Sequence, residues 1–223
     1  SPKYKHLLSP LKVGNFVLKN RLVASNSLPH FLQGPERYPA DPVIAHYENK
    51  AKSAAITTCM GINNFTAGLQ LPMDADFSHF PDYDLYDTNC QNYLMHLSDS
   101  IHFYDSIACM GIFVGPPSCY PVMKWEVGEV PPVKPGELAP PAPRHFTIEK
   151  IPGHNAPHEY TKEQLKKVCQ SYAEQAEILK TLDYDMISIH MCYRANLPAK
   201  FFSPLTNERR DEYGGSLENR MRF

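Results

Sequence analysis

The stretch IACMGIFV, from Ile107 to Val114, is a short apolar run that ends at the turn residues Gly115-Pro116-Pro117. A run of this length with such a boundary is typical of a strand that is buried on both faces. Residues 89–104, just before it, carry apolar side chains at helical spacing. We therefore predict a helix that leads directly into a buried strand.

The same order of elements recurs along the chain. Three more apolar runs predict strands, at residues 21–25, 54–60 (bounded by Gly61) and 185–190. Two more helices are predicted, one behind Asp41 as its N-cap and one behind the capping box formed by Thr161 and Gln164. A further helix is expected to start at Ser216, and a hairpin is expected between Leu11 and Leu18 around Gly14-Asn15.

Alternating helices and near-continuous apolar strands predict a parallel sheet covered by helices. Long segments follow the strands, whereas the returns from helix to strand are short. This asymmetry is typical of a (β/α)8 TIM barrel and also of a doubly wound fold, but no G-x-G-x-x-G follows any strand. We expect about the first four units of a barrel. Its open sheet edges would be closed by the remainder of the barrel or by a second copy in a homo-oligomer.

Proline is concentrated in one region of the chain. The sequence has 21 prolines against 11 glycines, and 11 of the prolines lie between Pro116 and Pro157. Proline and its preceding residue disfavour helices and central strands. We therefore expect residues 115–158 to form an irregular loop over the mouth of the barrel.

Composition excludes several classes of protein. The 223 residues carry a net charge of −2, which argues against a nucleic-acid or anionic-membrane surface. No apolar run reaches the roughly 20 residues of a membrane helix, and SPKYKHLLSPLK at the start lacks the apolar stretch of a signal peptide. The six cysteines form no C-x-x-C pair and the ten histidines no H-E-x-x-H motif. We expect a cytoplasmic protein with reduced thiols and without a metal site.

Two segments resemble one known family. Residues 202–220, FSPLTNERRDEYGGSLENR, resemble the fourth-strand loop of the Old Yellow Enzyme family of FMN-dependent oxidoreductases, and residues 8–21, LSPLKVGNFVLKNR, resemble the family's opening hairpin and first strand. The branch of bile-acid-inducible NADH oxidoreductases and 2,4-dienoyl-CoA reductases is the most similar. The resemblance implies that residues 1–223 are the N-terminal half of an FMN-binding TIM barrel, with the barrel proper from residue 20 onward.

The resemblance also implies a reaction. Hydride passes from NAD(P)H through FMN to a small molecule with an activated double bond, an enone or an enoyl thioester. Such chemistry requires hydrogen-bond donors at the substrate carbonyl oxygen and a general acid for the α-carbon. His190 matches the family's first donor, and Tyr193 stands where a histidine or asparagine is usual. We expect Tyr193 to act as proton donor from a shifted position and Arg194 to add a cationic donor.

Flavin contacts are expected at the ends of the first two strands. After Ala24, the residues Ser25, Asn26 and Ser27 stand where the family has a Pro-Met-Thr run, and Gly61 matches a position where the flavin approaches the backbone. At the third strand, Phe113 replaces a glutamine that hydrogen-bonds the flavin. An alternative is therefore a degenerate, flavin-free barrel that acts as a structural or ligand-binding subunit, with Arg194 holding a carboxylate.

The fourth-strand signature itself is expected to be scaffold. Its arginines and Asp211 can form a charged network, Gly214-Gly215 can form a turn, and Ser216 can cap a helix.

Overall fold

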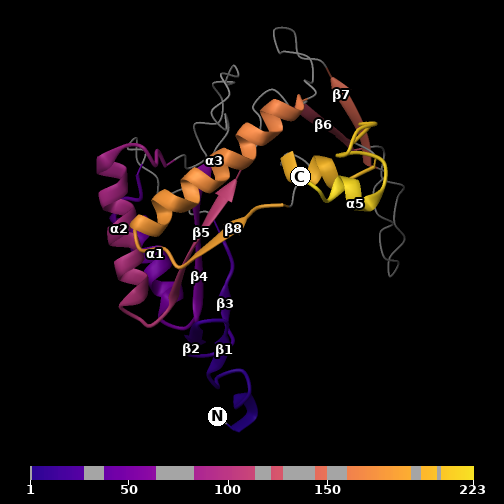
Figure 1. Cartoon of the computed structure of the whole chain (residues 1–223). Coiled ribbons are helices and arrows are strands. Elements are labelled where there is room, and N and C mark those ends of the chain that lie inside the picture. Colours follow the sequence, from indigo (N-terminus) through magenta and orange to yellow (C-terminus); the bar gives the residue numbers. More distant parts are fainter. Residues whose placement is uncertain are drawn as a thin grey trace.

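The parallel sheet and its helices form the main body of the molecule. The computed structural model describes residues 2–27, 38–63, 83–113, 122–127, 144–149, 160–191, 197–204 and 207–223. The sheet contains four parallel strands in chain order, β3 (Val23–Ala24), β4 (Ile56–Asn63), β5 (Ile107–Phe113) and β8 (Met186–Ile189). Three helices lie on one face of this sheet (Figure 1), namely α1 (Asp41–Ala51), α2 (Thr88–His102) and α3 (Lys162–Thr181). These are successive β/α units of a (β/α)8 barrel, as expected.

The core lies between the sheet and these helices. It forms because each helix carries apolar residues at i, i+3 and i+4 and so buries one continuous side. The predicted faces of α1 and α2 are confirmed, since their central apolar residues are at most 5% exposed. They pack on strand residues that point to the same face, including Cys59, Met110 and Ile112.

Helix starts follow local hydrogen bonding, with one correction. Asp87 caps α2 by accepting from the backbone N–H of Asn89, and Thr161 and Gln164 form the predicted capping box of α3. Asp41, in contrast, is the first residue of α1, and Ala40 is the N-cap without a side-chain bond. The start is favoured by Pro42, which has no N–H to leave unpaired, and by the charge of Asp41 in the first turn.

Strand β4 runs further than predicted. It continues past Gly61 to Asn63, with a shift in its pairing to β5 between Met60 and Ile62. At this bulge a Cβ on Gly61 would overlap the ring of Tyr83, whose backbone N–H donates to the Gly61 carbonyl oxygen at 2.8 Å. Glycine is thus required here by close packing within a strand, not as a strand end.

The predicted hairpin is confirmed at the amino-terminal edge of the sheet. A short 3-10 helix (Pro2–Tyr4) precedes β1 (Leu11–Val13), which pairs antiparallel with β2 (Phe16–Leu18). Gly14 has a φ of +56°, which the turn requires and glycine adopts readily. The hairpin leads to Lys19, whose ammonium group donates to the backbone carbonyl oxygens of Ala51 and Tyr104. Lys19 therefore ties the ends of α1 and α2 together.

Part of the proline-rich region is regular, which corrects the expectation of an irregular loop. β6 (Val122–Val127) and β7 (Arg144–Glu149) pair antiparallel in a separate two-stranded ribbon. Neither segment contains proline, so every residue in them retains a backbone N–H for pairing. The rest of residues 115–158 lies outside the described part of the chain, and its place over the mouth remains a prediction.

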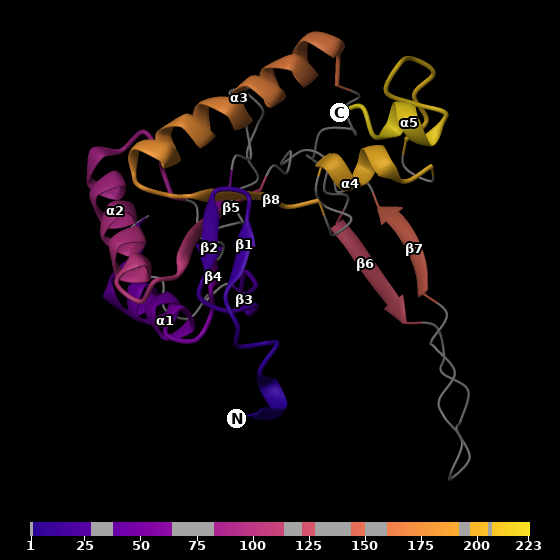
Figure 2. The same ribbon diagram turned by 60° about the horizontal axis from the view of Figure 1, so that its bottom comes forward.

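A second, smaller cluster lies at the other end of α3 (Figure 2). It packs Leu165 and Val168 of α3 against α4 (Leu197–Phe202), and Phe223 stacks on Phe201 with ring centroids 4.5 Å apart. No sequence pattern predicted α4. The predicted helix at Ser216 is confirmed as α5 (Leu217–Arg220), with the Ser216 side chain accepting from the N–H of Asn219.

Candidate functional site

The predicted site residues lie at or close to the carboxyl ends of β3, β4 and β8, with Ala24 the last residue of β3 and Gly61 inside β4. In a (β/α)8 barrel these ends form the mouth in which the active site lies. Among the predicted residues, Ala24, Ser25, Asn26, Gly61 and His190 are described by the structure. Tyr193 and Arg194 lie outside the described residues, so their roles remain predictions.

His190 lies directly beyond β8, beside β5. Its backbone N–H donates to the Ile112 carbonyl oxygen at 3.0 Å, which extends the strand pairing by one residue. Side chains alternate along a strand, so His190 shares a face with Ser188, while Ile187 packs into the core under the helices. His190 therefore belongs to the face turned away from α1–α3, which is the interior of a barrel.

The ionisation of His190 suits hydrogen-bond donation. Burial lowers the pKa of its imidazole below the usual 6.5. At neutral pH the ring is therefore uncharged, with one nitrogen carrying a proton that it can donate. A neutral donor at this position can stabilise negative charge that develops on a ligand oxygen.

Asn26 reaches the same part of the sheet from the opposite side. Its side-chain nitrogen lies 3.8 Å from Met60 Sδ on β4 and 4.0 Å from the position of a Cβ on Gly111 of β5. Gly111 pairs with Met60 and with Ser188, so Asn26, which follows β3 and reaches across β4, and His190, which follows β8, approach β5 from its two sides. The structure thus brings these two predicted residues to one interior region.

Side chains of helix α1 bind Ser25 and Ser27 through hydrogen bonds. Lys50 Nζ donates to the Ser25 carbonyl oxygen at 3.2 Å and to Ser27 Oγ at 2.5 Å. The Tyr47 hydroxyl donates to the Ser27 carbonyl oxygen at 3.0 Å. Neither Tyr47 nor Lys50 is among the site residues predicted from the sequence. The signal available was their place on the buried side of the helix, where a lysine needs an oxygen partner.

Gly61 and Phe113 are less informative for a cofactor. Tyr83 occupies the side of Gly61 on which a Cβ would stand, and Tyr83 belongs to the core under the helices. This packing accounts for the glycine without a ligand, and its flavin contact stays a prediction. Phe113 is the last residue of β5, and its side chain is outside the described part of the structure.

The groups near the carboxyl ends of these strands fit a flavin. Flavin rings present carbonyl oxygens and ring nitrogens, and they need donors and acceptors on a flat, small-residue surface. The Ser25–Ser27 segment supplies hydroxyl and amide groups, His190 supplies an imidazole, and Gly111 between them has no side chain. A Cβ at Gly111 would come within 3.0 Å of the Cys59 carbonyl oxygen, so a larger residue would crowd the edge.

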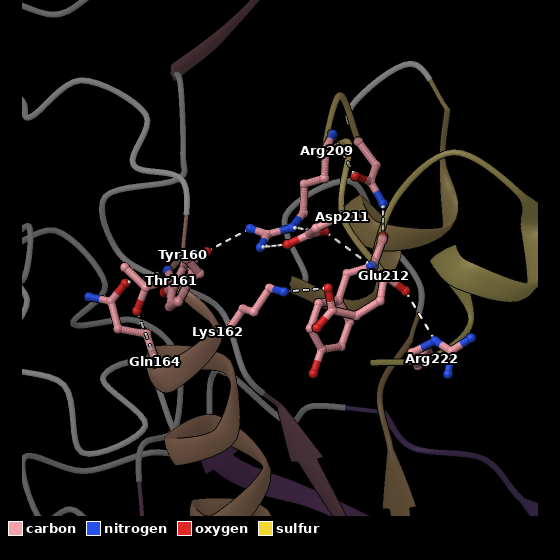
Figure 3. Close-up of polar contacts among 10 residues, drawn as sticks. Tyr160, Thr161, Lys162, Gln164, Arg209, Asp211, Glu212 and Arg222 are labelled. Carbon is pink, nitrogen blue, oxygen red and sulfur yellow. Dashed lines mark hydrogen bonds and ion pairs between the residues drawn. The ribbon is translucent and has the colours of Figure 1, made fainter.

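The fourth-strand signature is scaffold, as predicted (Figure 3). The Arg209 guanidinium binds the Asp211 carboxylate with Nε 3.0 Å from Oδ1, and it also donates to the Tyr160 carbonyl oxygen at 2.6 Å. Asp211 in turn accepts from the N–H of Tyr213, and these bonds hold the pKa of the Asp211 carboxyl below 3.8. The network joins the loop before α5 to the start of α3.

Glycines complete this turn. A Cβ on Gly214 would overlap the Arg209 carbonyl group, and Gly215 has a φ of +78°. The role of the signature is therefore to fix the chain that follows β8, and none of these contacts is catalytic in kind.

Cys59, Cys90, Cys109 and Cys169 are not joined in disulfides. Among the helices of the described residues, none has the length and hydropathy needed to span a bilayer.

Several known proteins are similar in sequence to this chain. A cinnamate reductase of Clostridium sporogenes is 26% identical over 225 residues, covering 99% of this chain and 31% of the relative. An NADPH dehydrogenase of Listeria welshimeri is 28% identical, covering 97% of this chain and 57% of the relative. The chain therefore spans between a third and somewhat over half of the length of these relatives.

Solved structures agree on the fold. Old Yellow Enzyme from Pichia matches with a TM-score of 0.69 at 19% identity, covering 97% of this chain and 53% of that structure. Morphinone reductase matches with a TM-score of 0.65 at 17% identity, covering 97% of this chain and 57% of that structure. The model of the NADH:flavin oxidoreductase / NADH oxidase family matches residues 6–223. From its sequence and its (β/α) architecture, this chain belongs to the NADH:flavin oxidoreductase / NADH oxidase family.

Proposed function

We propose that the protein containing this chain is an FMN-dependent NAD(P)H oxidoreductase of the ene-reductase type. The observation that carries the proposal is the position of His190, a neutral imidazole that directly follows β8 on the interior face. Membership of the family and the names of the similar proteins, a cinnamate reductase, a morphinone reductase and NADPH dehydrogenases, support this reaction class.

The chain's own residues have two tasks in this proposal. FMN supplies hydride transfer from a reduced nicotinamide to the β-carbon of an alkene conjugated to a carbonyl group. Ala24, Ser25, Asn26 and Gly61 would hold the cofactor at the ends of β3 and β4. His190 would donate to the substrate carbonyl oxygen as negative charge accumulates there.

Tyr193 and Arg194 complete the proposed chemistry. After hydride addition the α-carbon must gain a proton, and the phenol of Tyr193 is the general acid that we assign. Arg194 would pair with a substrate carboxylate or carbonyl, which suits an acid such as the one named in the cinnamate reductase relative.

The test is anaerobic oxidation of NADH and NADPH by the purified protein with a panel of cyclic enones, cinnamate and an enoyl thioester. We expect consumption of the nicotinamide to depend on at least one of these alkenes. Tyr193→Phe should slow reoxidation of the reduced flavin by the alkene and leave its reduction by the nicotinamide unchanged. Tyr86→Phe is the matched control, because Tyr86 is a surface tyrosine, 65% exposed in the turn before α2. An unchanged reoxidation rate in Tyr193→Phe would remove Tyr193 from the proposal.

A second candidate is a flavin-free barrel with a structural or ligand-binding role. It is favoured by Phe113 in place of a hydrogen-bonding glutamine, since a phenyl ring cannot make that bond, and by the tight packing of Tyr83 on Gly61. Purified protein that neither contains nor takes up FMN, but binds a carboxylated ligand in calorimetry, would favour this candidate.

A further inference from the structure

The Ser25–Ser27 segment depends on α1 more than on the sheet. The pairing of β3 with β4 ends at Ala24 and Thr57. Beyond that point, the hydrogen bonds of Ser25 and Ser27 within the described part of the chain all involve side chains of α1, namely His46, Tyr47 and Lys50. The position of the segment is thus set by the helix beneath it.

Lys50 makes the largest share of these contacts. An ammonium group has three N–H donors, and two of those on Lys50 bind the Ser25 carbonyl oxygen and Ser27 Oγ. The Lys50 Nζ also lies 5.3 Å from the centroid of the Tyr47 ring, so the same cation packs on an aromatic face. Three independent contacts therefore fix the ammonium group directly behind the segment.

Tyr47 anchors the clamp to β4. It is fully buried, its hydroxyl donates to the Ser27 carbonyl oxygen, and the same oxygen accepts from the N–H of Met60 at 3.0 Å. The segment, α1 and the bulge of β4 are thereby joined through one side chain. Because Ser25 and Ser27 are held toward α1, the residue between them, Asn26, is directed onto Met60 and Gly111 on the interior side.

The Ser27 hydroxyl is turned to the helix and not to the interior face. Its oxygen accepts from Lys50 Nζ and lies 3.4 Å from His46 Nε2, and both of these residues belong to α1. The clamp therefore acts on the interior face through the Asn26 side chain, which the two held serines direct there.

We propose that Lys50 is a positioning residue that clamps Ser25–Ser27 to α1 and thereby holds Asn26 in place for the flavin. The inference rests on the proposed function, because it requires that FMN binds at this edge. It extends that function by assigning part of the cofactor affinity to a helix residue that would not touch the cofactor.

The test measures the FMN dissociation constant in Lys50 variants. Lys50→Met removes the charge and both bonds, and we expect about tenfold weaker FMN binding. Lys50→Arg keeps the charge and a donor and should restore most of the affinity. Lys52→Met is the matched control and should leave the affinity unchanged, because Lys52 contacts Glu48 and Asn49, not the segment.

A double-mutant cycle with Ser27→Ala separates clamping from a general loss of structure. If Lys50 acts through Ser27, the losses of FMN affinity in Lys50→Met and Ser27→Ala should be far from additive in the double variant. Lys50→Gln provides a neutral variant that retains a donor, should Lys50→Met fail to fold. Normal FMN affinity in Lys50→Met or Lys50→Gln would overturn the inference while leaving the proposed function intact. Wild-type protein that binds no FMN would overturn both.

Discussion

The two ends of the parallel strands, which we call the amino edge and the carboxyl edge of the sheet, are built in opposite ways. At the amino edge, polar groups are buried or capped: Thr57 and Ser106 share a buried hydrogen bond of 2.9 Å, and Lys19 binds the ends of two helices. At the carboxyl edge, Ser25 and Ser27 are exposed and His190 is half-buried. The polar groups at the amino edge are therefore satisfied within the protein, whereas those at the carboxyl edge are accessible to a ligand.

The amino edge also fixes the fourth strand. The Asp185 carboxylate accepts from the backbone N–H of Ala108 at 2.9 Å and pairs with His102 Nε2 at 2.8 Å. This side chain joins the start of β8 to β5 and to the end of α2. In this barrel fold the amino ends of the strands are expected to serve stability and their carboxyl ends to carry the active site. The contacts at the amino ends of these strands agree with the first part of that division.

The largest effect on stability is expected from a substitution in the core between the helices and the sheet. Ile101 near the end of α2 is fully buried, so Ile101→Ala should lower the free energy of unfolding by about 2–5 kcal/mol. Chemical denaturation of wild type and variant measures this loss. Phe103→Ala is the control, since Phe103 is 79% exposed two residues away and should change stability little. Equal losses in the two variants would contradict the assigned core.

A smaller loss of stability is expected when the Lys19 hydrogen bonds at the amino edge are removed. Lys19→Met removes a charged donor from two helix-end carbonyl oxygens and should cost about 1.5–3 kcal/mol. Lys12→Met on the exposed hairpin strand is the control. Both should leave FMN affinity unchanged in equilibrium titrations. A loss of FMN binding in folded Lys19→Met protein would contradict the assignment of stability to one edge and of cofactor binding to the other.

The opposite pattern is expected at the carboxyl edge. His190→Ala should change the free energy of unfolding by less than about 0.5 kcal/mol, because the side chain is only half-buried. The rate of alkene reduction should fall by about 10²–10³, the usual cost of losing one donor to a developing oxyanion. His96→Ala on the exposed side of α2 should alter neither. A large loss of stability with normal turnover would assign His190 to the scaffold.

The smallest effect concerns acid pH. Burial lowers the folded-state pKa of His190 below the unfolded value of 6.5, so the unfolded chain binds more protons between these two pKa values. Stability therefore rises with pH across that window and is lost as pH falls from 6.5 toward the folded pKa. His190→Asn should reduce this slope by less than one proton, measured by denaturation at several pH values. A steeper slope in the variant would contradict the direction of the pKa shift.

The buried core of the molecule was predicted well, because buried residues recur at regular spacing along helices and form short apolar runs in strands. Helical spacing identified the inner faces of α1 and α2, and short apolar runs identified the four sheet strands. The errors occurred where a local signal competed with tertiary contacts. Gly61 reads as a strand end, yet it lies inside β4 because Tyr83 packs on it. The proline count concealed β6 and β7, which lie between the prolines.

The open edge was harder to predict because its contacts join distant segments. His190 and Asn26 were identified only through a family resemblance. Nothing in the spacing of α1 indicates that Lys50 reaches back over 23 residues to Ser27. Such a contact depends on how the helix returns over the strand, which is a property of the fold and not of local sequence.

The central claim is that this carboxyl edge holds FMN. The most direct measurement is the visible absorption spectrum of the purified protein after incubation with excess FMN and removal of unbound cofactor. The account predicts a flavin band corresponding to one FMN per chain, lost in Asn26→Ala and retained in Lys12→Met. A colourless protein with no flavin released on denaturation would contradict it.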